Sequence, residues 1–202
     1  MLDRHASAAL KPLINALARP LRRAGLNANQ ITVAGLLTGL LAAWLIVQGA
    51  FLAGAAAILL SRLCDALDGA VARMSQATDA GAFLDIAMDF LFYASIPLAF
   101  ALADPGANAL AAAVLLAAFI GTGSSFLAFA VLAERRGLAS TAFPQKGFYY
   151  LGGLTEATET LICFGLMCLW PDKFAWWAYG FASLCAMTIA TRIVGGAKAL
   201  SR

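Results

Sequence analysis

Four aspartates stand in two helix-spaced pairs within an otherwise apolar stretch of the sequence. Asp65 and Asp68 are three residues apart, and Asp85 and Asp89 are four residues apart. On a helix, both spacings place the side chains on one face, with about 5 to 6 Å between their β-carbons. Carboxylate oxygens are the hard ligands that Mg²⁺ and Mn²⁺ prefer, and these ions usually keep positions open for substrate phosphates. The spacing therefore predicts a divalent-metal site that receives a diphosphate.

The composition makes these charges costly. The chain has 202 residues, of which 62% are hydrophobic and only 12% are charged, and its mean hydropathy of +0.81 is that of a polytopic membrane protein. An Asp at mid-bilayer costs roughly 2.5 to 3.5 kcal/mol on insertion scales, and repulsion between like charges adds to this. Bound divalent cations would offset that cost.

Six apolar runs are long enough to cross a bilayer, which takes about 20 residues. They are residues 31–49, 51–73, 81–102, 109–133, 147–170 and 174–195. None alternates polar and apolar residues as a membrane barrel strand would, and unpaired backbone groups cannot face lipid. We therefore predict an all-α polytopic membrane protein with six transmembrane helices, formed by residues 25–202 and preceded by a juxtamembrane segment at residues 1–24.

The N-terminal segment and the loops predict the orientation. Residues 1–24 mix leucines with spaced basic residues, which predicts an interfacial amphipathic helix interrupted near Pro12 and Pro20. With a cytoplasmic N-terminus, the outer loops hold only Lys173 among the basic residues. We expect both termini and the active site to face the cytoplasm. The basic face suits anionic membrane lipids, and no interleaving of aromatic and basic residues indicates a nucleic-acid partner.

The connection between the second and third runs places the two aspartate pairs together. MSQATDA, residues 74–80, is short and polar, so the two helices should be antiparallel neighbours with their carboxylates facing each other. Gly69 follows Asp68 directly, and Gly81 precedes Asp85 by one turn. Each glycine leaves a bare patch where a phosphate or a flat ring could approach, although packing alone also explains them.

Together these residues resemble the signature of the CDP-alcohol phosphotransferases, the membrane enzymes that make phospholipids from CDP-activated precursors. The pattern is Asp65-x2-Asp68-Gly69-x2-Ala72-Arg73-x7-Gly81-x3-Asp85-x3-Asp89, with a spacer after Arg73 that is short for the family. Asn29-Gln30-Ile31-Thr32 is similar to the family's Pro-Asn-x-Ile-Thr opening, with Ala28 where proline is common. The later spans resemble the family only in hydropathy.

The resemblance implies a reaction and a set of roles. A pair of Mg²⁺ or Mn²⁺ ions would bind the diphosphate of a CDP-lipid, by default CDP-diacylglycerol, while a small alcohol attacks and CMP leaves. The metal ligands would be Asp65, Asp68, Asp85 and Asp89, and Asp89 would also be the base for the acceptor hydroxyl. The nucleotide and diphosphate would contact Gly69, Ala72, Arg73, Gly81, Asn29 and Thr32. Family members are commonly homodimers.

Other polar residues have two interpretations each. An acceptor could bind to Arg135, Arg136, Lys146, Glu156, Glu159 and Arg192; contact with lipid headgroups and hydrogen bonding between helices are the alternatives. Arg73 could be an ordinary cytoplasmic anchor instead of a phosphate ligand. Arg62, one turn before Asp65, could pair with that carboxylate or contact a phosphate.

Two other functions compete with this interpretation. A polyprenyl-diphosphate transferase also uses Asp-rich motifs and Mg²⁺, but it would need more spans and would not require the intervening Gly-x2-Ala-Arg. A small cation carrier could use the acidic cluster as an ion site. The position of the aspartates in the predicted cytoplasmic half, and the lack of an inverted repeat, argue against a carrier.

Overall fold

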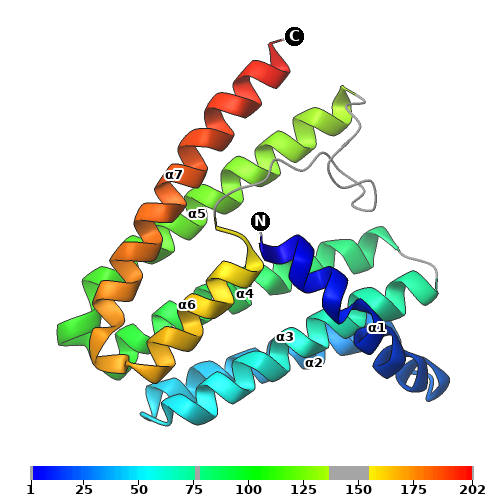
Figure 1. The fold of residues 1–202 in the computed structure, drawn as a ribbon, viewed down its shortest axis with the longest axis horizontal. Helices are drawn as coiled ribbons and strands as arrows, with labels where there is room; N and C mark the ends of the chain where they lie inside the picture. Colours follow the sequence, from blue (N-terminus) through cyan, green and yellow to red (C-terminus); the bar gives the residue numbers. More distant parts are fainter. Residues whose placement is uncertain (1, 76–77, 137–154, 202) are drawn as a thin grey trace.

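Every regular element in the described part of the chain is helical. The computed structural model describes residues 2–75, 78–136 and 155–201. The elements, shown in Figure 1, are α1 (Leu2–Arg23), α2 (Ala28–Val47), α3 (Phe51–Met74), α4 (Asp79–Ala103), α5 (Pro105–Arg135), α6 (Ala157–Leu169), the 3₁₀ turn η1 (Pro171–Lys173) and α7 (Phe174–Leu200). The all-α prediction is confirmed.

Four of the described helical segments are long and apolar enough to cross a membrane, and the chain is an integral membrane protein. They are α2, α4, α5 and the continuous η1–α7 segment Pro171–Leu200. α3 is 24 residues long but carries four charged side chains, and α6 has only 13 residues, about 20 Å at 1.5 Å per residue. The count of six spans therefore stays a prediction.

α1 is one continuous helix, so the predicted interruption near Pro12 and Pro20 is wrong. A proline removes one backbone donor and crowds the preceding turn, which kinks a helix but need not end it when good helix formers flank it. Tertiary packing supports the helix between the prolines. Ile14 and Ala18 are buried in a cluster with Leu67 and Val71 of α3, and in Figure 1 α1 crosses this end of α3.

Two glycines let α2, α3 and α4 approach closely. The Ser61 hydroxyl of α3 donates to the Gly35 carbonyl of α2 at 2.7 Å. A β-carbon on Gly35 would meet the Cys64 side chain at 3.2 Å, and one on Gly39 would meet the Phe92 ring of α4 at 2.5 Å. The small-xxx-small pair thus packs within the monomer, and it fixes the helices that carry the aspartates.

The other half of the fold is built on α5 and α7, which lie side by side in Figure 1. α6 contacts α3 and α7, and the main core joins the two halves through Phe92, Phe100, Phe164 and Phe174. The apolar run predicted over residues 147–170 forms a shorter helix among the described residues. α6 begins at Ala157, where Glu156 and Glu159 form a capping box; residues 147–154 lie outside the described residues.

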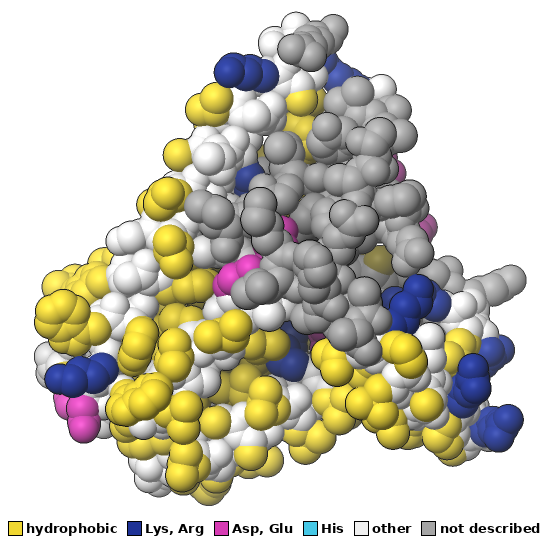
Figure 2. All heavy atoms as spheres, viewed as in Figure 1, with side chains coloured by type: hydrophobic (Ala, Val, Ile, Leu, Met, Phe, Trp, Pro, Cys, Tyr) yellow, Lys and Arg dark blue, Asp and Glu magenta, His cyan; other side chains and the backbone are white. Residues whose placement is uncertain are grey.

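The surface is that of a protein that lies in lipid. Figure 2 shows hydrophobic side chains spread over the lower part of the visible face, and basic side chains at the side where α1 lies. Large apolar side chains are exposed on several helices, among them Leu37, Leu52, Leu59, Leu110 and Trp176. Such a wide apolar surface would be a liability in water and is expected in a bilayer.

Candidate metal centre and substrate recess

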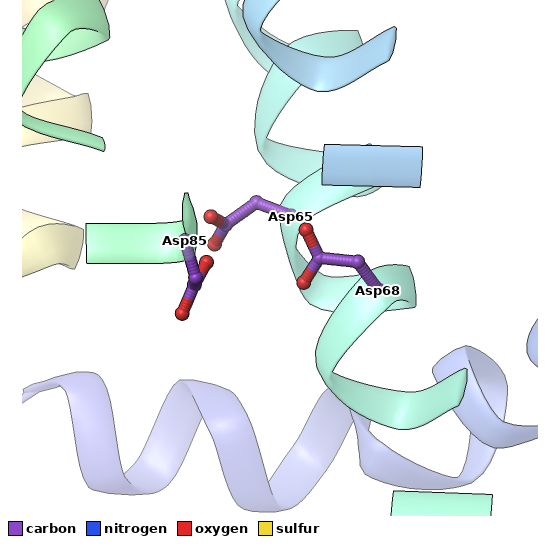
Figure 3. Close-up of side chains that lie close together, drawn as sticks. All are labelled: Asp65, Asp68 and Asp85. Carbon is purple, nitrogen blue, oxygen red and sulfur yellow. The ribbon is translucent and has the colours of Figure 1, made fainter. Parts of the chain in front are cut away.

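The aspartates of α3 and α4 converge as the sequence predicts. One carboxylate oxygen from each of Asp65, Asp68 and Asp85 lies within 4.8 Å of the others, and Figure 3 shows the three side chains turned toward one another. α4 is held at its start by Thr78, which accepts a hydrogen bond from the Gly81 backbone at 3.1 Å. This cap fixes the start of α4, and Asp85 follows before the end of its second turn, opposite the aspartates of α3.

The three carboxylates fit a divalent cation. Asp68 is only 5% exposed, and its Oδ2 atom is buried without a hydrogen-bond partner among the described residues. A buried carboxylate oxygen with no donor is costly, and so are three anionic groups this close together. A bound hard cation would accept the lone pair of the buried oxygen and reduce the repulsion among the three carboxylates. We therefore assign these oxygens as candidate ligands of Mg²⁺ or Mn²⁺.

A recess opens over this cluster. It is narrow, and its lining includes all four motif aspartates together with Thr32, Gly35, Leu36, Arg62 and Met88. α2, α3 and α4 each supply part of the wall. The site therefore combines a candidate cation-binding floor with a narrow opening between three helices, in a part of the molecule that is otherwise apolar.

Asp89 lies in the same recess but in a different environment. Its Oδ1 atom accepts a hydrogen bond from Arg62 Nη1 at 2.6 Å. The same guanidinium nitrogen lies 3.4 Å from Asp65 Oδ1. Of the two interpretations of Arg62, the structure has the ion pair with Asp65, but the shorter contact goes to Asp89. The fourth carboxylate is thus held by an arginine that also lies beside Asp65.

The residues expected to bind nucleotide and diphosphate surround this site in two groups. A β-carbon on Gly81 would meet Asn29 Oδ1 at 3.1 Å, so the starts of α2 and α4 lie together. A β-carbon on Gly69 would meet Arg73 Nη1 at 3.2 Å, so the exposed guanidinium of Arg73 lies over Gly69. Among these residues only Thr32 is part of the recess lining. Ala72 lies on the same final turns of α3, half-buried.

The residues expected to bind the acceptor do not line the recess, as far as they are described. Arg192 is buried between α5 and α7, where Nη1 donates to the Thr122 carbonyl at 3.1 Å. Arg136 donates to the Leu200 carbonyl at the end of α7, and Arg135 is exposed at the end of α5. Glu156 and Glu159 cap α6. Lys146 lies outside the described residues.

Several contributors to the site carry no signature in the sequence. Phe92 supports Arg62, whose guanidinium carbon lies 3.8 Å from the ring centroid, and Ser61 ties α3 to α2. Leu36 and Met88 line the recess as ordinary apolar residues. Helical spacing offers a partial signal, because Met88 and Phe92 lie three and seven residues after Asp85 and so share its face.

Comparisons with known proteins agree with this geometry. The family model described as CDP-alcohol phosphatidyltransferase matches residues 26–191. The chain is 52% identical over 196 residues to the inner membrane protein YnjF of Escherichia coli (strain K12). The alignment covers 97% of this chain and 95% of that protein.

Solved structures share the fold. Phosphatidylinositol phosphate synthase (PgsA1) of Mycobacterium tuberculosis with CDP-DAG bound has a TM-score of 0.73 and 23% identity, over 92% of this chain and 94% of that chain. The same synthase in complex with manganese and citrate has a TM-score of 0.71 and 24% identity, over 91% of this chain and 88% of that chain.

Proposed function

Because the chain belongs to the CDP-alcohol phosphatidyltransferase family, we propose that it transfers a phosphatidyl group from CDP-diacylglycerol to a small alcohol and releases CMP. The observation that carries this proposal is the convergence of the three motif carboxylates, Asp65, Asp68 and Asp85, on the floor of a recess. A diphosphate is the substrate group that such a floor suits, once a cation is bound. Two similar structures contain CDP-DAG and manganese respectively, which supports both parts.

The residues around the recess have distinct roles in this reaction. Asp65, Asp68, Asp85 and Asp89 would hold Mg²⁺ or Mn²⁺, which when bound supplies positive charge to the diphosphate and to the departing CMP. Asp89 would accept the proton of the acceptor hydroxyl. The hydroxyl oxygen then bonds to the lipid-side phosphorus, and the bond from that phosphorus to CMP breaks. Arg62 donates to Asp89 Oδ1 and so orients that carboxylate.

The nucleotide is proposed to bind along the ends of the same helices. Gly69 and Ala72 would leave room beside α3, and the Arg73 guanidinium over Gly69 could turn to the phosphates. Gly81 and Asn29, which lie in contact range, would form the opposite wall with Thr32. The acceptor residues remain proposals, and Arg192 and Arg136 would have to exchange their backbone partners to take part.

The cellular arrangement is proposed on the same basis. The excess of Lys and Arg in the predicted inner segments supports a cytoplasmic active site with both termini cytoplasmic. A homodimer is proposed from the family resemblance. Gly35 and Gly39 would not form its interface, because they contact α3 and α4 of the same chain.

The test is CMP release by the purified chain in mixed micelles containing CDP-diacylglycerol and Mg²⁺ or Mn²⁺. Glycerol phosphate, serine, inositol phosphate and choline would be supplied one at a time. We expect release with one of them, abolished by Asp85→Asn and retained by Asp172→Asn, which removes an exposed aspartate of η1. Cation flux in proteoliposomes without consumption of CDP-diacylglycerol would instead support a carrier.

A further inference from the structure

Arg62 is a buried cation among the four motif aspartates. Its side chain is only 11% exposed, and its Nη1 atom lies 2.6 Å from Asp89 Oδ1 and 3.4 Å from Asp65 Oδ1. Its Nε atom is buried without a hydrogen-bond partner among the described residues. A buried guanidinium is costly unless its charge is compensated. Arg62 therefore depends on these two carboxylates.

The two carboxylates depend on Arg62 in turn. Asp65 and Asp89 come from different helices, α3 and α4, and their side chains are in contact with each other. Neighbouring carboxylates repel each other, and a positive charge beside both of them reduces that repulsion. Asp65 also belongs to the cluster with Asp68 and Asp85 (Figure 3). Arg62 therefore lies where the two aspartate pairs of the motif meet.

The surrounding side chains hold the guanidinium in this place. Its carbon lies 3.8 Å from the centroid of the Phe92 ring, and Nη2 lies 3.3 Å from the Ser61 hydroxyl. Phe92 is fully buried and packs edge-on against Phe164. Arginine stacked on an aromatic face with its planar fork on a carboxylate is a pre-organised arrangement. The positive charge is therefore fixed beside the carboxylates.

A fixed positive charge has opposite effects on the protein without divalent ions and on the binding of those ions. Before ions bind, the charge stabilises carboxylates that would otherwise repel one another. When an ion binds to the same carboxylates, the ion and the guanidinium repel each other, so the ion binds less tightly. Because Asp89 has two carboxylate oxygens, contact with Arg62 at Oδ1 is compatible with ligation of an ion by Asp89.

We propose that Arg62 is a positioning residue that holds Asp65 and Asp89 together before divalent ions bind and, through the same charge, lowers the affinity of the metal centre for those ions. All four motif aspartates remain ligands of the centre. The proposal rests on the proposed function for the identity of that centre. It adds a role for a residue that lies outside the eight-residue motif.

The experiment compares Mn²⁺ affinity and thermal stability. The full-length protein, purified in detergent micelles and freed of metal, is titrated with MnCl₂ alone, and free Mn²⁺ is followed by electron paramagnetic resonance. Thermal unfolding is followed by tryptophan fluorescence in EDTA and in saturating Mn²⁺. Arg62→Met should bind Mn²⁺ at least about threefold more tightly than the wild type. Its loss in Tm should be larger in EDTA than in Mn²⁺, because the bound ion replaces the missing charge.

The matched control is Arg192→Met, which removes another buried arginine. Arg192 donates to the Thr122 carbonyl and does not line the recess, so its loss in Tm should be the same in EDTA and in Mn²⁺. A packing role alone would give Arg62→Met the same pattern, with Mn²⁺ bound no more tightly than by the wild type. That result would overturn the proposal.

A double substitution separates charge from packing. Arg62→Met/Asp89→Asn removes the guanidinium together with its closest carboxylate. In EDTA it should melt above Arg62→Met, because the carboxylate that lost its counter-charge is gone. A Tm equal to or below that of Arg62→Met would show that lost packing sets the stability and would overturn the proposal.

A further comparison does not require Arg62→Met to fold. Asp85→Asn and Asp89→Asn each remove one repelling carboxylate, but only Asp89→Asn also removes the closest partner of Arg62. Asp89→Asn should therefore melt below Asp85→Asn in EDTA, and a Tm at or above that of Asp85→Asn would overturn the proposal.

These measurements do not use CMP release, so the role of Arg62 can be refuted while the transferase proposal stands. No Mn²⁺ bound by the wild type would refute the metal centre and the role of Arg62 together.

Discussion

Replacement of Asp85 by Asn should change the stability of the protein in opposite directions with and without a divalent ion. Asp85 is one of three aspartates whose carboxylate oxygens lie within 4.8 Å of one another. Without metal these groups repel one another, and the substitution removes two of the three pairwise repulsions while it keeps the size of the side chain. With metal bound, the same substitution removes a ligand.

The distance sets the magnitude. For unit charges 4.8 Å apart, the repulsion is about 0.9 kcal/mol per pair at the dielectric constant of water and about 3.5 kcal/mol at an effective value of 20. Two pairs thus correspond to about 2 to 7 kcal/mol. Because the recess is open, we expect a gain near the lower end, about 2 kcal/mol. For soluble chains of this size that corresponds to a rise of roughly 4 to 8 °C in Tm.

The assay is thermal unfolding of the detergent-purified protein, followed by tryptophan fluorescence, in EDTA and in Mn²⁺. Asp85→Asn should melt above the wild type in EDTA and show little further rise in Mn²⁺, whereas the wild type should gain stability as Mn²⁺ is added. Asp172→Asn, on η1, should follow the wild type in both conditions. An Asp85→Asn protein that melts below the wild type in EDTA would refute the expectation that repulsion dominates at Asp85.

Two further substitutions test the packing that positions the site. Gly39→Ala would place a β-carbon 2.5 Å from the fully buried Phe92 ring, so we expect a loss of about 1 to 3 kcal/mol in unfolding free energy. The control is Gly180→Ala, which has open space around the new β-carbon and should be neutral or stabilising. Equal Tm values for the two variants would contradict the close approach of α2 to Phe92. Thr78→Ala removes the side chain that caps α4 at Gly81. We expect this substitution to lower the unfolding free energy by about 1 kcal/mol and to weaken Mn²⁺ binding in a titration. Unchanged Mn²⁺ binding would mean that the cap does not position Asp85.

The convergence of the three aspartates could be predicted because it depends on local rules. Spacings of three and four residues set the helix face, and the short connection between the apolar runs makes α3 and α4 neighbours. Only the depth and rotation of one helix against the other were left open. The roles of Asp65, Asp68 and Asp85 as metal ligands remain a prediction that the Mn²⁺ titration checks.

The pairing of Arg62 with Asp89 could not be read from the sequence. Helical spacing directs attention to Asp65, three residues away, whereas Asp89 is 27 residues away on another helix. Whether the two meet depends on the rotation of α3 against α4. That rotation follows from the glycine contacts of α2 with Ser61 and Phe92, which are visible only after packing.

The position where α6 begins and the continuity of α1 could not be predicted from hydropathy. The apolar run continues on both sides of Ala157, but the described helix begins there because Glu156 and Glu159 cap it. A search for apolar length overlooks the reciprocal cap that these two glutamates form. In α1, the cost of Pro12 and Pro20 is local, and burial of Ile14 against α3, which no sequence window reports, supports the helix.

The two halves of α3 have different surroundings, and this difference explains where its charged residues lie. Its first half exposes Leu52, Leu59 and Leu60, as a helix in contact with lipid does. Its second half, from Arg62 onward, carries the charged side chains, and there Leu67 and Val71 pack against α1. α1 therefore covers an apolar stripe on the half of α3 that is least suited to lipid, while the carboxylates turn to the recess. An amphipathic segment before the first span is thus part of the structure that supports the site.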